Sequence, residues 1–127
     1  MRIRPCTGVA MVVAMAAALV LWGDAPALAH AQLRSATPAA GSSTQTAPAE
    51  VVVNFSESLE GAFSTLVVRD AAGKRVDKAD SHLDGDNKTT MRVSLPPLEP
   101  GIYTVDWRAV STDTHRVNGS FTFRVGQ

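Results

Sequence analysis

The stretch Ile102-Tyr-Thr-Val-Asp-Trp-Arg-Ala109 decides the fold, because apolar and polar side chains alternate along its whole length. Successive side chains of a strand point to opposite faces of a sheet. Tyr103 and Trp107 would therefore share one face with the other apolar members, while Asp106 and Arg108 would lie on the opposite face. This pattern predicts a β-strand with one buried face and one face in water.

Shorter runs with the same period of two occur on both sides of this stretch. We expect strands over residues 33–36, 51–55, 66–69, 75–77, 91–95 and 121–125. Segments rich in Pro, Gly, Asp and Asn lie between several of the runs and suit turns, at 38–43, 84–87 and 96–101. Seven short strands with such turns, and no helix of useful length, predict an all-β antiparallel sandwich.

The first 29 residues have the features of a secretory signal peptide. Arg2 and Arg4 precede an uncharged apolar run over 9–21, and Ala27-Leu28-Ala29 has the small-x-small pattern of a cleavage site. The run is shorter than the roughly 20 residues that a membrane-spanning helix needs. We therefore expect residues 1–29 to be removed and residues 30–127 to form one exported domain.

The cleavage point matters because three A-x-A frames overlap, at 25–27, 27–29 and 29–31. Only the middle frame makes His30 the first residue of the mature chain. The free α-amine and the imidazole of His30 would then form a bidentate chelate. The other two frames leave His30 internal or remove it.

Composition excludes several classes of protein. Lys and Arg balance Asp and Glu at 12 each, so the basic excess of a nucleic-acid-binding protein is missing. The single cysteine, Cys6, lies ahead of the apolar run, which is the wrong place for a lipid-modified cysteine. We therefore expect no lipid anchor in the mature chain. We also expect no transmembrane anchor there. That chain then has no disulfide and no thiolate ligand. About 98 residues suffice for one sandwich but scarcely for a deep substrate cavity.

The candidate metal ligands are few, because the chain has only three histidines. We expect His82, in a polar stretch, to be exposed. Asp113 and His115 are two residues apart, so in an extended chain a carboxylate and an imidazole would point to the same side. In the alternative interpretation Asp113 bonds the backbone of a turn and His115 is a solvated loop residue.

Together with His30, this pair would supply three nitrogens and one oxygen. Such a donor set suits Cu(II) in a tetragonal arrangement, and zinc if the arrangement is tetrahedral. Glu57, just after the strand predicted at 51–55, could hold an imidazole N–H or ligate weakly. It could equally be an exposed loop carboxylate.

Four blocks of the sequence resemble the CopC family of periplasmic copper-resistance proteins. They are His30-Ala-Gln-Leu-Arg-Ser-Ala-Thr-Pro-Ala-Ala-Gly-Ser42, Val53-Asn-Phe-Ser-Glu-Ser-Leu59, Gly101-Ile-Tyr-Thr-Val-Asp-Trp-Arg-Ala-Val-Ser-Thr-Asp-Thr-His115 and Asn118-Gly-Ser-Phe-Thr-Phe-Arg-Val125. The resemblance implies a seven-stranded Greek-key sandwich of immunoglobulin-like or cupredoxin-like shape.

The resemblance also implies a Cu(II) site, with one ion per chain. The family's N-terminal histidine falls on His30 and forms a histidine brace, its D-x-H pair falls on Asp113 and His115, and its glutamate falls on Glu57. Some members carry a methionine-rich loop that holds Cu(I). Because residues 70–88 contain no methionine, and Met91 stands alone, we expect no such Cu(I) site.

We therefore expect a monomeric, non-enzymatic Cu(II)-binding protein that sequesters or carries copper for resistance or homeostasis. The resemblance implies delivery to an inner-membrane importer of the CopD type. The expected location is the periplasm, or the exterior of a single-membrane cell. Two alternatives stay open. One is a histidine-brace copper oxygenase, and the other is a metal-free, immunoglobulin-like surface module, which requires that His30 is not the mature N-terminus.

Overall fold

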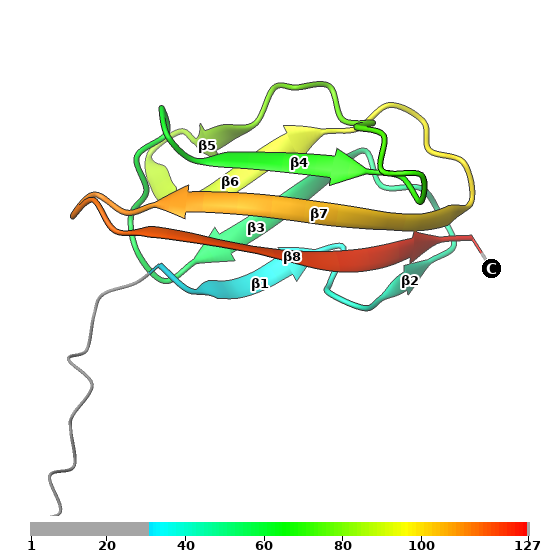
Figure 1. The fold of residues 1–127 in the computed structure, drawn as a ribbon, viewed down its shortest axis with the longest axis horizontal. Helices are drawn as coiled ribbons and strands as arrows, with labels where there is room; N and C mark the ends of the chain where they lie inside the picture. The colour runs from blue at the N-terminus through cyan, green and yellow to red at the C-terminus, as the bar shows by residue number, and fades with distance from the viewer. Residues whose placement is uncertain (1–30, 127) are drawn as a thin grey trace, which may run out of the picture.

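Two four-stranded sheets pack face to face in the computed structural model, which describes residues 31–126 (Figure 1). One sheet has the order β1-β3-β6-β5 and the other β2-β8-β7-β4. The strands are β1 (Leu33–Thr37), β2 (Ser43–Thr44), β3 (Glu50–Phe55), β4 (Thr65–Arg69), β5 (His82–Asp84), β6 (Asn87–Ser94), β7 (Gly101–Val110) and β8 (Arg116–Val125). The predicted all-β sandwich is confirmed.

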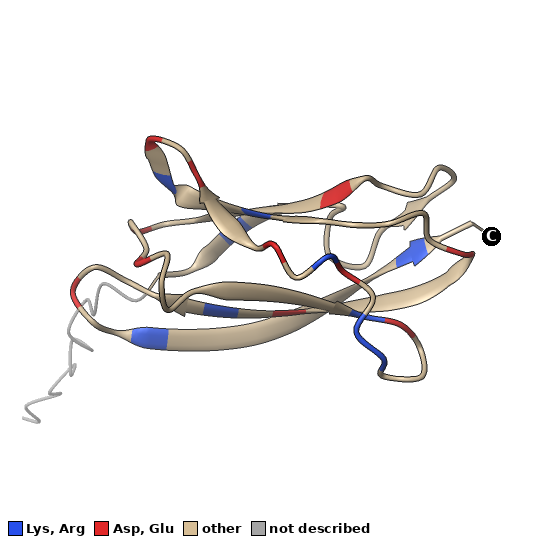
Figure 2. Ribbon diagram, turned by 90° about the horizontal axis from the view of Figure 1, so that it is seen from above, with Lys and Arg blue, Asp and Glu red and all other residues tan. Residues whose placement is uncertain are grey.

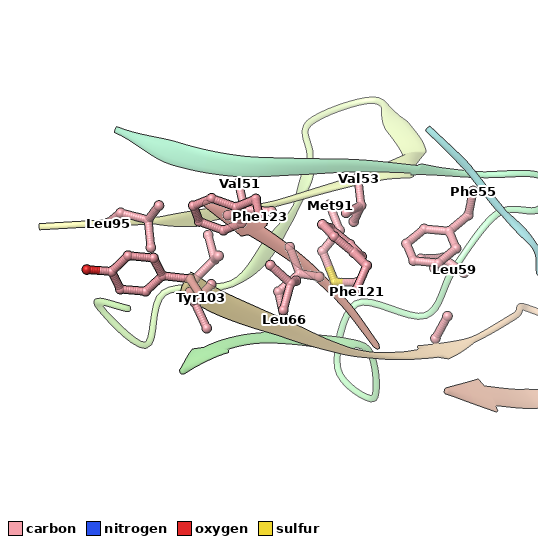
Figure 3. Packing of buried hydrophobic residues seen from close by; sticks show 14 of the residues in the cluster. Val51, Val53, Phe55, Leu59, Leu66, Met91, Leu95, Tyr103, Phe121 and Phe123 are labelled. Atoms are coloured by element: carbon pink, nitrogen blue, oxygen red, sulfur yellow. The ribbon is translucent and has the colours of Figure 1, made fainter. Parts of the chain in front are cut away.

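The core lies between the two sheets and consists of the inward-facing side chains of the alternating runs (Figure 3). Met91 is fully buried and Tyr103 is 5% exposed, as their place in the alternation predicts. The Tyr103 ring stacks on Phe123 from the neighbouring strand, with ring centroids 5.6 Å apart. Trp107 is only half-buried, because it lies near the end of the sandwich.

The β7–β8 hairpin is the longest paired unit of the fold. Its register runs without a shift from Gly101 opposite Val125 to Val110 opposite Arg116. A regular ladder of this length holds the turn that follows Val110 at a fixed place. That turn lies at the same end of the sandwich as the start of β1 and the β3–β4 connection (Figure 1).

The structure differs from the sequence prediction at three short segments. Two strands were not expected, β2 and β5, so the described residues form eight strands rather than seven. β2 pairs with β8 in parallel, through two residues, which departs from the antiparallel pattern. Residues 75–77 form no strand, since only an isolated bridge joins Arg75 to Arg69. All three segments are short and mostly polar, so apolar alternation is a weak guide there: it missed two strands and predicted one that does not form.

Candidate metal centre

The turn between β7 and β8 consists of residues 111–115 and is closed by its own backbone. The amide of Ser111 donates to the carbonyl oxygen of His115 over 3.0 Å, and the amide of Thr114 donates to the carbonyl oxygen of Ser111 over 2.9 Å. Thr114 has a φ of 72°, in the left-handed region, which lets the chain reverse within a few residues. The side chains on either side of Thr114 are thereby turned toward one another.

Asp113 and His115 come into direct contact in this turn. The Nδ1 atom of His115 lies 3.1 Å from Oδ1 of Asp113, and both side chains are partly exposed. The Ser111 hydroxyl donates a hydrogen bond to the same carboxylate oxygen. This bond, and then the one from His115, lower the pKa of Asp113 below its ordinary value. Asp113 is therefore an ionised carboxylate, the form that binds a cation.

The proximity of Asp113 and His115 agrees with the sequence prediction, but its cause does not. The prediction assumed an extended chain, whereas these residues lie in a turn with Thr114 in the left-handed region. The alternative interpretation is correct about the turn. It is wrong about a merely solvated His115, whose imidazole contacts the carboxylate.

The spacing of the two donor atoms fits a shared ion. Two ligand atoms at about 2.0–2.1 Å from one metal, separated by angles of about 90–109°, lie about 2.8–3.4 Å apart. Nδ1 of His115 and Oδ1 of Asp113 are 3.1 Å apart, within that interval. An ion could thus bind both atoms with little movement of either side chain.

Glu57 lies in the β3–β4 connection, between neighbours that contact two other segments. On one side, Ser56 and Gln32 exchange two hydrogen bonds, of 2.8 and 2.9 Å. On the other side, the carbonyl oxygen of Ser58 accepts a hydrogen bond of 3.0 Å from the amide of Thr112. Half-buried Glu57 is therefore placed between the start of β1 and the β7–β8 turn.

His30 lies outside the described residues, so its predicted role as a ligand is not tested. The next residue, Ala31, is fully buried and belongs to the core cluster. Residues 31–33 line one shallow surface depression together with Trp107, Arg116 and Val117. Arg116 directly follows His115 in the chain. The described N-terminal segment therefore begins beside the strand that leads out of the Asp113–His115 turn.

The segments that carry the predicted ligands thus converge at one end of the sandwich, although they are far apart in sequence. Within residues 31–126 the structure does not bring three histidine, aspartate, glutamate or cysteine side chains together around one point. It brings together the pair Asp113 and His115. His82 is exposed, as expected, and lies in β5, where its Nδ1 is 2.8 Å from the carbonyl oxygen of Asp80.

The sequence prediction missed two residues that shape this end of the molecule. The Ser111 hydroxyl orients Asp113, and the spacing Ser-x-Asp before a histidine was the available signal. Gly119 pairs with Trp107 across the hairpin. A Cβ atom on Gly119 would lie 2.6 Å from Cζ2 of Trp107, so only glycine leaves room for the indole. No feature of the local sequence marks this requirement.

Comparisons with known proteins place this chain among copper proteins. The CopC domain family matches residues 33–126. Copper resistance protein C of Pseudomonas syringae pv. tomato is 44% identical over 108 residues, which cover 80% of this chain and 85% of that protein. Copper transport protein CutJ of Bacillus subtilis is 35% identical over 100 residues, which cover 78% of this chain and 18% of that protein.

A solved structure has the same fold. The crystal structure of PcoC, a methionine-rich copper resistance protein from Escherichia coli, superimposes with a TM-score of 0.68. Its sequence is 38% identical, and the match covers 76% of this chain and 99% of PcoC. Among the residues that the structure of the present chain describes, no helix is long and apolar enough to cross a membrane.

Proposed function

This chain belongs to the CopC family, and on that premise we propose that it is an exported protein that binds one Cu(II) ion and sequesters or carries copper. Copper binding itself follows from the family, since its relatives are named for copper resistance and copper transport. The observation that carries the proposal is the contact between Asp113 and His115, whose donor atoms are spaced for one shared ion.

The proposed ligand set is the amine and imidazole of His30, Nδ1 of His115 and the carboxylate of Asp113. Cleavage after Ala29 would create the amine at the end of the sandwich where the Asp113–His115 turn lies. Glu57 is assigned an orienting or weakly ligating role, because its neighbours connect the two segments that carry the histidines. Three nitrogens and one carboxylate oxygen favour Cu(II) over Cu(I), which prefers thiolate or thioether sulfur.

Methionine is not assigned to the site. Met91 is the one methionine beyond the predicted signal peptide, and its side chain is fully buried between the sheets. A buried thioether cannot reach an ion at the surface. In this respect the chain differs from PcoC, which is described as methionine-rich. We expect reduction to Cu(I) to weaken binding strongly, as a titration with a Cu(I)-selective chelator would measure.

A carrier role is favoured over an oxygenase role by the Asp113 carboxylate. An anionic ligand beside three nitrogens fills a position that oxygen activation would need open. The expected result is that the copper-loaded protein consumes no additional reductant when polysaccharide is added. Reductant consumption that depends on the polysaccharide would contradict the carrier role.

Delivery to an inner-membrane importer of the CopD type is part of the proposal. Support comes from CutJ, a copper transport protein in which the matched region is only 18% of the length. A domain of this family is there joined to a much longer chain. We place the present protein in the periplasm, or outside a single-membrane cell, because residues 1–29 have the pattern of a signal peptide.

Copper titration of three single variants tests the proposed ligands. His115→Ala and Asp113→Ala should each weaken Cu(II) binding by about tenfold or more, because each removes one donor from the shared ion. His82→Ala is the matched control, since His82 is exposed on the other sheet. If His82→Ala weakens binding as much as His115→Ala does, the assignment of the site to the β7–β8 turn is wrong.

A further inference from the structure

The outer face of the β2-β8-β7-β4 sheet is basic, although the chain as a whole carries no formal net charge. Four arginines occupy outward positions of its strands, and one acidic residue, Asp106, lies among them. Asp106 pairs with Arg69 over 3.2 Å. The other three arginines, Arg108, Arg116 and Arg124, form no ion pair within residues 31–126.

The opposite sheet has a smaller excess, since its strands carry three basic residues, Arg34, Lys88 and Arg92, against two acidic residues, Glu50 and Asp84. On its outer face Arg92 contacts Glu50 over 2.7 Å and Asp84 over 3.0 Å, so one cation lies between two anions. Figure 2 shows the two layers edge-on, with basic positions near both ends of the last strand, which leads to the marked C-terminus. The basic excess is therefore larger on the β2-β8-β7-β4 sheet, where it is four arginines against one aspartate.

Two of the unpaired arginines lie near the copper-binding end and close to one another. Arg108 is opposite Asn118, and Arg116 is opposite Val110, so Arg108 and Arg116 are diagonal neighbours on one face. Diagonal neighbours across an antiparallel pair are about 7–8 Å apart. Both line one open depression of about 520 Å³. Guanidinium groups so placed can hold a carboxylate between them.

An exposed aromatic ring completes this surface. Phe63, in the β3–β4 connection, is 64% exposed. The other exposed large hydrophobic residue of the described chain, Ile102, is 44% exposed. Phe63 lines the same depression as Arg108 and Arg116. Aromatic residues and arginine are the side chains most enriched at the centres of protein interfaces. The depression is concave, which suits a protruding peptide segment better than a flat surface.

We propose that the depression formed by Phe63, Arg108 and Arg116 is a docking surface for an acidic segment of the protein that exchanges copper with this chain. That the exchanged cargo is copper rests on the proposed function. The docking surface itself does not depend on that function. Arg116 directly follows the ligand His115. A partner held by its acidic side chains at this depression would therefore be placed beside the bound copper ion.

Copper transfer to two synthetic peptides tests the proposal. Both acceptors carry the same fluorescent, histidine-based Cu(II)-chelating head, and they differ only in a tail of glutamates or of lysines. At low ionic strength the glutamate acceptor should receive copper about tenfold faster, because opposite charges accelerate association. The advantage should shrink as salt is added. Equal rates for the two acceptors would overturn the proposal.

Two double variants locate the effect. The double variant Arg108→Gln with Arg116→Gln should transfer copper to the glutamate and lysine acceptors at similar rates. Its Cu(II) affinity should stay within about twofold of that of the unchanged protein. Lys74→Gln with Lys78→Gln removes the same charge from exposed positions in the segment after β4, at the far end of the sandwich, and should preserve the difference. If both double variants lose the advantage equally, net charge and not this surface is responsible, and the proposal fails.

A titration without copper separates this proposal from the proposed function. Copper-free protein mixed with the glutamate tail alone should show NMR amide shifts at Phe63, Arg108 and Arg116, whether or not the chain binds copper. Absence of these shifts overturns the proposal. Vesicles of phosphatidylglycerol and phosphatidylcholine serve as the competing probe. Vesicle binding that the arginine double variant abolishes, with no shift from the peptide, would assign the surface to a membrane instead.

Discussion

At the scale of single residues, Ser111 decides how Asp113 is presented. Its hydroxyl donates to Oδ1 of Asp113, the oxygen that also contacts Nδ1 of His115. Ser111 itself is 2% exposed, so its orientation is fixed by the surrounding structure. Residues that orient metal ligands in this way are often worth 10- to 100-fold in metal affinity.

The variant Ser111→Ala should weaken Cu(II) binding about tenfold, because the carboxylate loses the bond that holds it toward His115. Competition titration against a chelator of known affinity measures the change. Thr112→Ala is the control, since its exposed side chain lies in the same turn while its amide keeps the bond to Ser58. Unchanged affinity in Ser111→Ala would show that Asp113 needs no such orientation.

The residues of the candidate site could be predicted only in part. Residue type and spacing were enough to select Asp113 and His115. The actual cause of their contact, a tight turn with Thr114 in the left-handed region, depends on hydrogen bonds that the spacing does not encode. The support from Ser111 was overlooked, although the spacing Ser-x-Asp before the histidine was an available signal. The role of His30 stays a prediction, because it depends on where the chain is cleaved.

Gly119→Ala should destabilise the fold by about 1–3 kcal/mol, because the added methyl group must displace the indole of Trp107. Trp107 packs edge-on against Phe55, with ring centroids 5.2 Å apart, so the displacement reaches the core. Denaturant unfolding followed by Trp107 fluorescence measures it. Gly61→Ala is the control, since its methyl group would make an ordinary 3.4 Å contact with Leu83. Equal effects of the two variants would contradict this explanation.

At the scale of elements, apolar alternation predicts every strand that has a fully buried residue, and the two strands that it misses have none. β3, β4, β6, β7 and β8 each bury alternate residues, and all were expected from the sequence. β2 and β5 have no fully buried residue. Their pairing is fixed by neighbouring strands after the sandwich forms, which is tertiary information that a single sequence does not show.

The segment after β4 is held by a buried carboxylate instead of a strand ladder. The Asp77 side chain is fully buried and accepts hydrogen bonds of 2.7 Å from the amides of Val68 and Ala79. Burial alone would raise the pKa of Asp77. The hydrogen bonds from Arg75 and from the two amides outweigh burial and hold the pKa below its ordinary value.

Because the folded pKa of Asp77 is lowered, its stabilising contribution is present above the unfolded pKa of about 3.9. It is lost as the pH falls through the lower folded pKa. At neutral pH, Asp77→Asn should reduce the free energy of unfolding by about 1–3 kcal/mol. This gap should narrow below about pH 4, as urea unfolding at several pH values would measure.

Asp106→Asn is the matched control for the buried carboxylate. Asp106 also pairs with an arginine, Arg69, but both side chains are 45% exposed. An exposed ion pair contributes about 0–1 kcal/mol, so this variant should be nearly neutral at every pH. If Asp77→Asn is equally neutral, the segment after β4 is held by its backbone contacts and not by the carboxylate.

At the scale of the whole molecule, the sandwich serves to bring three separate segments to one end. The start of β1, the β3–β4 connection and the β7–β8 turn are joined there by direct hydrogen bonds. The opposite end is formed by the β6–β7 connection and the C-terminal part of β8 (Figure 1). A copper ion bound at the first end would join the N-terminus to the longest hairpin of the fold.

The central claim is that an amine created at His30 completes a Cu(II) site with Asp113 and His115. The most direct test is N-terminal sequencing and intact mass of the exported protein, followed by electron paramagnetic resonance with one equivalent of Cu(II). The account predicts a chain that starts at His30 and a tetragonal, nitrogen-rich signal that His115→Ala alters. A chain that starts at Leu28 or Gln32, or a signal indifferent to His115→Ala, would contradict it.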